Sequence, residues 1–245
     1  MLKLFFAALF LFVNGFFVAK VPDATRPELA FVSVLFVIVI AAPSFLALKN
    51  WLGTGRAFSI VAALGFYALF IETVAIHTGW PYGAFEYGDK IGTKIGVVPW
   101  TVFFSWSPLV LGAYALGRSF FKNKPPKFAP FLAISVAFLV AFDGVLDPGA
   151  VQQGFWKFDA GGAYYGVPLS NYFGWFFSGV VGVCLMYFLS GKRHDAPIAL
   201  VWSSVLVLAF WTSIALFTAM WIPAILGFAL LFWCFREFRA QSPKI

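Results

Sequence analysis

Long apolar runs alternate with short polar breaks along the whole chain. Charges, prolines and glycine clusters divide it into eight apolar segments, at residues 4–19, 29–48, 57–76, 98–117, 128–147, 171–190, 197–217 and 221–236. A helix of about 20 apolar residues, rising ~1.5 Å per residue, spans the ~30 Å hydrocarbon core of a bilayer. We therefore expect an all-α, polytopic integral membrane helix bundle of about eight transmembrane helices, with residues 1–245 forming a single transmembrane domain.

The composition agrees with this pattern. The 245 residues are 62% hydrophobic and 21% aromatic but only 11% charged, and 33 Phe and 10 Trp exceed what so small a core could bury. A water-soluble domain is excluded, and the lipid bilayer is the expected partner. The net charge of +7 is scattered between apolar runs instead of forming a basic patch, so we expect no nucleic acid partner.

The distribution of positive charge predicts the orientation. With eight crossings, 12 of the 17 Lys and Arg residues fall on the side of the N-terminus. Cytoplasmic segments carry the excess of positive charge, so both termini are predicted to be cytoplasmic in a multi-pass protein of the cell membrane. The first segment resembles a signal peptide, but residues 16–20 offer no small-residue cleavage site, and we predict a helix. The two longest connections, 77–97 and 148–170, fall on the opposite side.

Three acidic residues lie within the apolar segments, where a charge costs ~2.5 to 3.5 kcal/mol on insertion scales. Glu72 and Asp143 are each expected about 6 Å inside the non-cytoplasmic end of their helices. Asp143 and Asp147 are spaced i and i+4 on one helix face, where two carboxylates repel, so one should hold a proton. An alternative for Asp147 is a helix-end position, because Asp147-Pro148 would mark the exit from the fifth segment. The acids predict a proton donor or a proton relay.

Aromatic residues gather in the two long connections, interleaved with glycines. They could form an interfacial belt, or line a pocket in which π faces stabilise a cation. His77 could relay a proton or make an ordinary hydrogen bond, and Asn171 could hold a water or cap the sixth helix. Five helix glycines could contact a ligand or pack against other helices; they are Gly65, Gly112, Gly117, Gly179 and Gly182.

Other chemistries find no support in the sequence. Cys184 and Cys234 lie in apolar stretches without a CxxC pair, and there are only two histidines, so we expect no metal. No Lys lies inside any segment, which excludes a retinal Schiff base, and no phosphate-binding glycine loop is present. We expect no cofactor, and chemistry that depends on carboxylic acids and water.

Several motifs occur in one order over roughly residues 70–176, the motif-bearing core. They are Glu72, His77-Thr78-Gly79-Trp80-Pro81-Tyr82-Gly83-Ala84-Phe85-Glu86-Tyr87, Gly96-Val97-Val98-Pro99, Asp143-Gly144-Val145-Leu146-Asp147-Pro148, Trp156 and Gly162-Ala163-Tyr164-Tyr165-Gly166-Val167-Pro168-Leu169-Ser170-Asn171-Tyr172-Phe173-Gly174-Trp175. In these the chain resembles the membrane carotenoid hydratase family, which includes the γ-carotene 1',2'-hydratases and the bisanhydrobacterioruberin hydratases.

The resemblance implies addition of water across the terminal C=C of an acyclic (ψ) carotenoid end, giving a tertiary alcohol without a cofactor. The implied substrates are lycopene, γ-carotene or a C50 bisanhydrobacterioruberin-type carotenoid, and other carotenoid biosynthesis enzymes are implied as further partners. Asp143 or Asp147 would donate the proton, and the other carboxylate or Glu72 would activate the water. The residues expected to bind substrate or water are His77, Trp80, Tyr82, Glu86, Tyr87, Trp156, Tyr164, Asn171 and Trp175.

Three alternatives share some of these features. A carotenoid cyclase would form the same cation but let an internal alkene attack it. A proton-coupled transporter would use the intramembrane acids as a relay. A structural scaffold would tolerate loss of the acids altogether.

Overall fold

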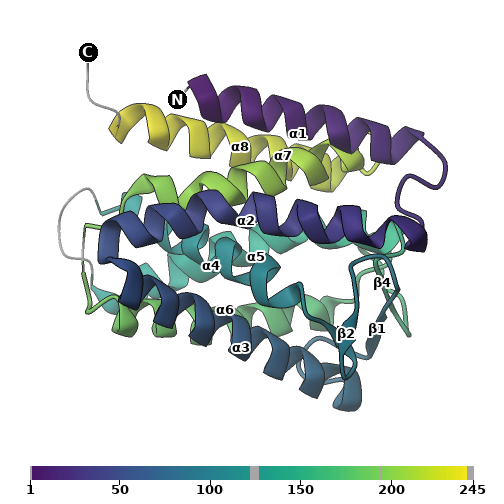
Figure 1. The fold of residues 1–245 in the computed structure, drawn as a ribbon, viewed down its shortest axis with the longest axis horizontal. Helices are drawn as coiled ribbons and strands as arrows, with labels where there is room; N and C mark the ends of the chain where they lie inside the picture. The colour runs from purple at the N-terminus through teal and green to yellow at the C-terminus, as the bar shows by residue number, and fades with distance from the viewer. Residues whose placement is uncertain (1, 122–126, 194, 242–245) are drawn as a thin grey trace.

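The computed structural model describes residues 2–121, 127–193 and 195–241, which form a bundle of eight α-helices (Figure 1). The helices are α1 Leu2–Lys20, α2 Ala30–Leu52, α3 Thr54–Thr78, α4 Val102–Ser119, α5 Phe128–Gln152, α6 Leu169–Leu189, α7 Trp202–Phe217 and α8 Trp221–Gln241. The short 3-10 helices η1 Pro27–Leu29 and η2 Ile198–Val201 precede α2 and α7. Each α-helix overlaps one predicted segment, and seven are long and apolar enough to span a membrane. The predicted polytopic membrane bundle is confirmed.

Helix α4 is the one described α-helix outside those seven spans, and it lies at the centre of the bundle. It packs against α2, α3, α5, α6 and α7, and every residue from Trp106 to Arg118 is buried. Protein therefore surrounds this helix where lipid would surround an outer one. That environment explains why α4 contains polar side chains such as Ser107 and Tyr114, which lipid-facing positions disfavour.

The start of α1 and the end of α8 lie at the same end of the bundle (Figure 1), as expected for an even number of helices that run alternately up and down. We call this the terminal end, and we call the opposite end, which carries the two long connections, the loop end. Which side of the membrane each end faces stays a prediction. Three residues of the charge count, Lys122, Lys124 and Lys244, lie outside the described residues.

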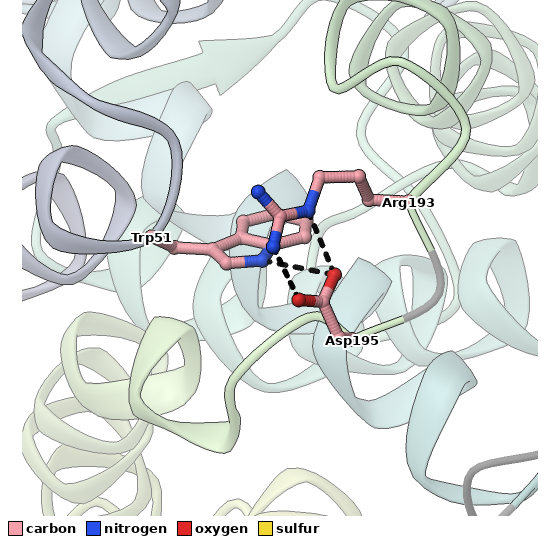
Figure 2. A network of polar contacts seen from close by, with 3 residues as sticks. All are labelled: Trp51, Arg193 and Asp195. Carbon is pink, nitrogen blue, oxygen red and sulfur yellow. Dashed lines mark hydrogen bonds and ion pairs between the residues drawn. The ribbon is translucent and has the colours of Figure 1, made fainter.

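A small polar network at the terminal end joins α2 to the connection between α6 and α7 (Figure 2). The indole Nε1 of Trp51 donates to Asp195 Oδ1 at 3.2 Å, and Arg193 Nε donates to the same oxygen at 2.9 Å. The Arg193 guanidinium holds the pKa of Asp195 at about 2 and lies 5.6 Å from the centre of the Trp51 ring. Because the pair is largely exposed, it fixes the position of the connection more than it stabilises the fold.

Small residues let the helices approach closely. A Cβ atom on Gly112 of α4 would lie 2.0 Å from Ser204 Oγ of α7, and one on Gly117 would lie 2.0 Å from Ser135 Oγ of α5. At Gly65, Gly179 and Gly182, neighbouring side chains also occupy the space that a Cβ atom would need. Close backbone approach and hydrogen bonds from small polar side chains take the place of the hydrophobic effect between helices in lipid. All five glycines considered above are therefore helix-packing contacts.

At the loop end the two long connections pair with each other. Strand β1 Phe85–Tyr87 of the first connection lies antiparallel to β4 Trp156–Phe158 of the second, and β2 Lys94–Ile95 pairs with β3 Val98–Pro99. We call the β1–β4 pair the ribbon. The eight-segment pattern did not predict it, because three-residue strands are too short to show a period in sequence.

Helix α5 corrects the predicted boundary of the second connection, which begins at residue 153 and not at 148. The helix continues through Pro148 to Gln152, so Asp147 lies inside it and does not end it. Proline lacks the N–H that would bind the carbonyl of Gly144, four residues earlier. The Tyr164 hydroxyl donates to that carbonyl at 3.0 Å instead, so the helix crosses the proline without an unsatisfied group.

Candidate active site

A cavity of about 250 Å³ lies beneath the ribbon, and its lining includes two of the three intramembrane acids. Glu72 of α3 and Asp147 of α5 both line it, together with Asn171 of α6. These residues are far apart in the sequence, and three different helices bring them to one place. Most of the remaining wall is apolar or aromatic, which is typical of a site for a small apolar group with a few fixed polar contacts.

The amide of Asn171 joins Asp143 to Asp147. Its Nδ2 atom donates to Asp143 Oδ2 at 2.9 Å and to Asp147 Oδ2 at 2.6 Å, so one NH₂ group uses both hydrogens on the two acids. This confirms that the two aspartates share a helix face. Helix α6 begins at Leu169 after the N-cap residue Pro168, so the interpretation of Asn171 as a helix cap is wrong.

Asp147 faces the cavity and Asp143 lies behind it. Both are buried, with 3% and 0% exposure, but only Asp147 is part of the cavity wall. Among the described residues, Asp143 Oδ1 has no hydrogen-bond partner. Two carboxyl groups this close to one donor favour a state in which the pair keeps a proton.

Glu72 is held by the ribbon. The Tyr87 hydroxyl of β1 donates to Glu72 Oε2, and burial raises the pKa of Tyr87 well above its usual range, so this phenol stays a neutral donor. Across the ribbon, Tyr87 pairs with Trp156, and their rings meet edge to face at 5.7 Å. The pairing of the two connections thus places a hydrogen-bond donor on an acid of α3.

The depths of the acids differ from those predicted, because α3 and α5 extend further than the apolar segments. At ~1.5 Å per residue, Glu72 lies about 9 Å from the end of α3 at Thr78. Asp147 lies about 8 Å and Asp143 about 14 Å from the end of α5 at Gln152. Glu72 therefore matches Asp147 in depth, and both side chains line the same cavity.

Aromatic side chains form the wall near the acids. Tyr82 lies 6.5 Å from Trp175 and 6.3 Å from Phe85 between ring centres, and its hydroxyl is 2.6 Å from Ser178 Oγ. Tyr82 packs against the backbone of Gly174, where a Cβ atom would lie 2.2 Å from its ring. Position 174 of the sequence motif is therefore glycine because any larger side chain would clash with the ring of Tyr82.

The cavity gathers most of the predicted site residues but not all of them. Its wall includes Glu72, Tyr82, Tyr87, Asp147, Trp156, Asn171 and Trp175. Tyr164 supports α5 through Gly144, as described above. Outside the cavity wall lie His77 and Trp80, which are exposed near the end of α3, and Glu86, which forms an ion pair with Lys157 at 2.8 Å. Trp80 is 53% exposed and packs edge to face against Phe177.

The sequence did not indicate the part of the wall that comes from α1, α2, α4 and α7. Examples are Asn14, Phe36, Trp106 and Phe210. An apolar side chain that faces a cavity carries the same signal as one that faces lipid, so the hydropathy pattern could not separate them. Among the described residues there is also no group of three or more His, Cys, Asp and Glu side chains that could hold a metal ion.

Comparison with known proteins places this site in a family. A family model described as carotenoid biosynthesis protein matches residues 29–234. The chain belongs to the carotenoid biosynthesis protein family. The match confirms the family predicted from the motifs and covers every acid of the cavity, whereas α1 lies before it.

Among curated relatives of this family, the chain is 38% identical over 187 residues to a bisanhydrobacterioruberin hydratase of Haloarcula japonica. The alignment covers 72% of the chain and 63% of the relative, so the chain spans less than two thirds of that protein's length. No solved structure matches the chain.

Proposed function

We propose that this protein is a carotenoid hydratase, which adds water to the terminal C=C of an acyclic carotenoid end and leaves a tertiary alcohol. One observation carries the proposal: Asp147, which Asn171 bridges to Asp143, and Glu72 meet at one cavity whose wall is mostly apolar. The family supplies the class of substrate, and the relative's name supplies the reaction. The substrate is a carotenoid with a ψ end, such as lycopene or a bisanhydrobacterioruberin-type carotenoid.

Asp147 is the proton donor in this proposal, because it is the aspartate of the cluster that faces the cavity. Its proton goes to the less substituted carbon of the terminal alkene, whose π electrons form the new C–H bond and leave a tertiary cation. The carboxylate left on Asp147 keeps its hydrogen bond from Asn171, a charge-assisted bond that is stronger in the product of proton transfer than before it.

Glu72 then serves as the base. A water in the cavity attacks the tertiary carbon with an oxygen lone pair, and Glu72 takes the proton that the new hydroxyl loses. Tyr87 holds one Glu72 oxygen, which leaves the other to receive that proton. Proton exchange between the acids restores the starting state, so one alkene and one water give one alcohol. The rings of Tyr82, Trp156 and Trp175 lie in the same wall and could stabilise the cation.

The same protonation would begin a cyclisation, in which an internal alkene attacks the cation instead of water. The polar pair of Glu72 and Tyr87 in the cavity wall favours hydration, because it provides a fixed acceptor for water beside the cation. A cyclase site gains from excluding water at this point. The product therefore separates the two reactions, since a ring adds no mass.

The test is expression in cells that make lycopene, followed by mass spectrometry of the pigments. The wild type should give pigment heavier by one or two waters. Asp147→Asn should lower hydration about 10²-fold or more, the usual contribution of a general acid. Asp143→Asn should retain more activity, because this side chain lies behind the cavity wall.

Asp159→Asn is the matched control, since Asp159 is an exposed aspartate in the same connection as the ribbon strand β4. Its activity should equal that of the wild type. Unchanged pigment with the wild type, at a protein level shown by immunoblotting of the membranes, would remove the hydratase proposal. A cyclic product without added mass would replace it with the cyclase.

A further inference from the structure

The cavity extends well beyond the acids. Along α2 its wall includes residues from Val32 to Ala41, a length of about 14 Å at ~1.5 Å per residue. It also includes Asn14 and Val18 of α1, and Phe210 and Trp211 of α7. A chamber for one small end group would not need this length of apolar wall.

Helices α1 and α2 form the two sides of this extension, and α7 forms its floor. Helix α1 packs on α7, where a Cβ on Gly15 would lie 2.4 Å from the carbonyl oxygen of Phe210. Helix α2 packs on α3, α4 and α7, and the ring of Phe36 lies 4.7 Å from that of Phe210. Figure 1 shows α7 between α1 and α2. We call this space the α1–α2 cleft.

The mouth of the cleft faces the surroundings of the bundle. Val32 lines the cavity and is nevertheless 48% exposed. Of the seven candidate spans, those of α1 and α2 have the smallest buried shares, 22% and 17%, so both helices lie at the outside of the bundle. Asn14 of α1 lines the cavity from the other side, and its amide Nδ2 donates to the Phe10 carbonyl of its own helix at 2.8 Å.

We propose that the α1–α2 cleft receives the polyene of the carotenoid laterally from the bilayer, with the end group inserted toward Glu72 and Asp147. This inference rests on the proposed function. A carotenoid is insoluble in water and lies among acyl chains, so its route to the acids runs through an apolar opening in the membrane. The polyene is straight, stiff and apolar, and it gains by covering the apolar wall of α2 and α7.

The length of the cleft has a consequence for the reaction. The conjugated chain of a carotenoid is much longer than about 14 Å of helix, so its far part stays in lipid while one end is in the cavity. Each visit then hydrates one end. A carotenoid with two ψ ends leaves with one alcohol and must return in the opposite direction for the second.

The experiment compares two tryptophan substitutions on α2. Val37→Trp fills the cleft, since Val37 is part of the cavity wall. Val39→Trp is the matched control, because Val39 is 67% exposed, two residues along the same helix, and outside the wall. Wild type and both variants are purified in lipid nanodiscs, and lycopene binding is measured by its absorption spectrum. Turnover is measured with lycopene and with a short acyclic isoprenoid that has the same terminal alkene.

Val37→Trp should reduce lycopene binding and turnover at least tenfold while hydration of the short isoprenoid stays within twofold of the wild type. Val39→Trp should match the wild type in lycopene binding, in lycopene turnover and in hydration of the short isoprenoid. Equal lycopene binding by both variants would overturn the inference, as would a lipid acyl chain in the cleft that lycopene does not displace. If Val37→Trp lowers expression or the unfolding temperature, Val32→Trp at the exposed mouth takes its place.

Binding and turnover separate the two proposals. If the wild type binds lycopene but does not hydrate it, and Val37→Trp abolishes binding, the cleft proposal is supported and the hydratase proposal is refuted. If the wild type hydrates lycopene and the Val37→Trp variant does so as fast as the Val39→Trp variant, the hydratase proposal is supported and the cleft proposal is refuted.

Discussion

Asn171 is the single residue on which the acid cluster depends, and Asn171→Leu tests this directly. Leucine has the same branched arrangement of side-chain heavy atoms as asparagine but no polar atoms, so the substitution removes the two donors without opening a cavity. It leaves Asp143 and Asp147, at 0% and 3% exposure, without the amide that bridges them at 2.9 and 2.6 Å.

The expected loss of stability follows from these two bonds. A hydrogen bond to a charged group contributes about 1.5 to 3 kcal/mol and one to a neutral group about 0.5 to 1.5, and interhelical bonds in membranes fall at the lower end. We expect Asn171→Leu to lower the free energy of unfolding by about 2 to 3 kcal/mol. For a chain of this size that is a fall of about 5 to 10 °C in the unfolding temperature.

The loss of activity should exceed what instability explains. Without the bridge, Asp147 is free to rotate away from the substrate, and a displacement of about 1 Å costs about 10²-fold in rate. Hydration of lycopene should therefore fall about 10²-fold at temperatures where the variant is folded. Tryptophan fluorescence in detergent follows unfolding, and pigment mass spectrometry follows turnover.

Two comparisons make this test specific. Asn50→Leu, at an exposed asparagine of the terminal end, should change neither quantity. Adding Asp143→Asn to Asn171→Leu should restore part of the stability, because it removes the second buried acid and the two sites are coupled. An Asn171→Leu protein with wild-type unfolding temperature and wild-type turnover would refute the role of the bridge.

Two further predictions concern the ribbon and its connection. Tyr87→Phe removes the donor to Glu72 and should lower hydration about tenfold, with a smaller effect on lycopene binding; a rate equal to that of the wild type would show that Glu72 acts without it. Gly162→Ala would place a Cβ atom 2.1 Å from the backbone of Val167 and should destabilise the protein by about 2 kcal/mol or more in thermal unfolding. Gly161→Ala, where nothing lies within 4 Å and only the positive φ of +57° opposes alanine, should cost about 1 kcal/mol, and equal losses at both glycines would contradict the packing argument.

The apolar pattern was sufficient for the helices but not for their ends. Every described α-helix overlaps a predicted segment, because a span must place about 20 apolar residues in lipid and a helix enclosed by protein, such as α4, is apolar as well. The end of α5 was wrong by five residues, since the local rule that proline ends a helix was outweighed by a hydroxyl from Tyr164, distant in sequence. No local window contains that bond.

For the site, the sequence by itself determined which residues could do chemistry. Acids inside apolar segments are rare and costly, so Glu72, Asp143 and Asp147 stood out without any structure. The spacing of the two aspartates also fixed their common face, since the period of an α-helix does so alone.

Only the tertiary structure decided how those residues are used. It placed Asp147 in the cavity wall with Asp143 behind it, and Asn171 donates a hydrogen bond to each of them. It also brought Tyr87 to Glu72 by pairing two connections that lie about 70 residues apart. The α1–α2 cleft likewise arises from helices that are apolar over most of their surface. Contacts between distant segments depend on packing in three dimensions, and a hydropathy pattern records only whether a residue avoids water, not what it touches instead.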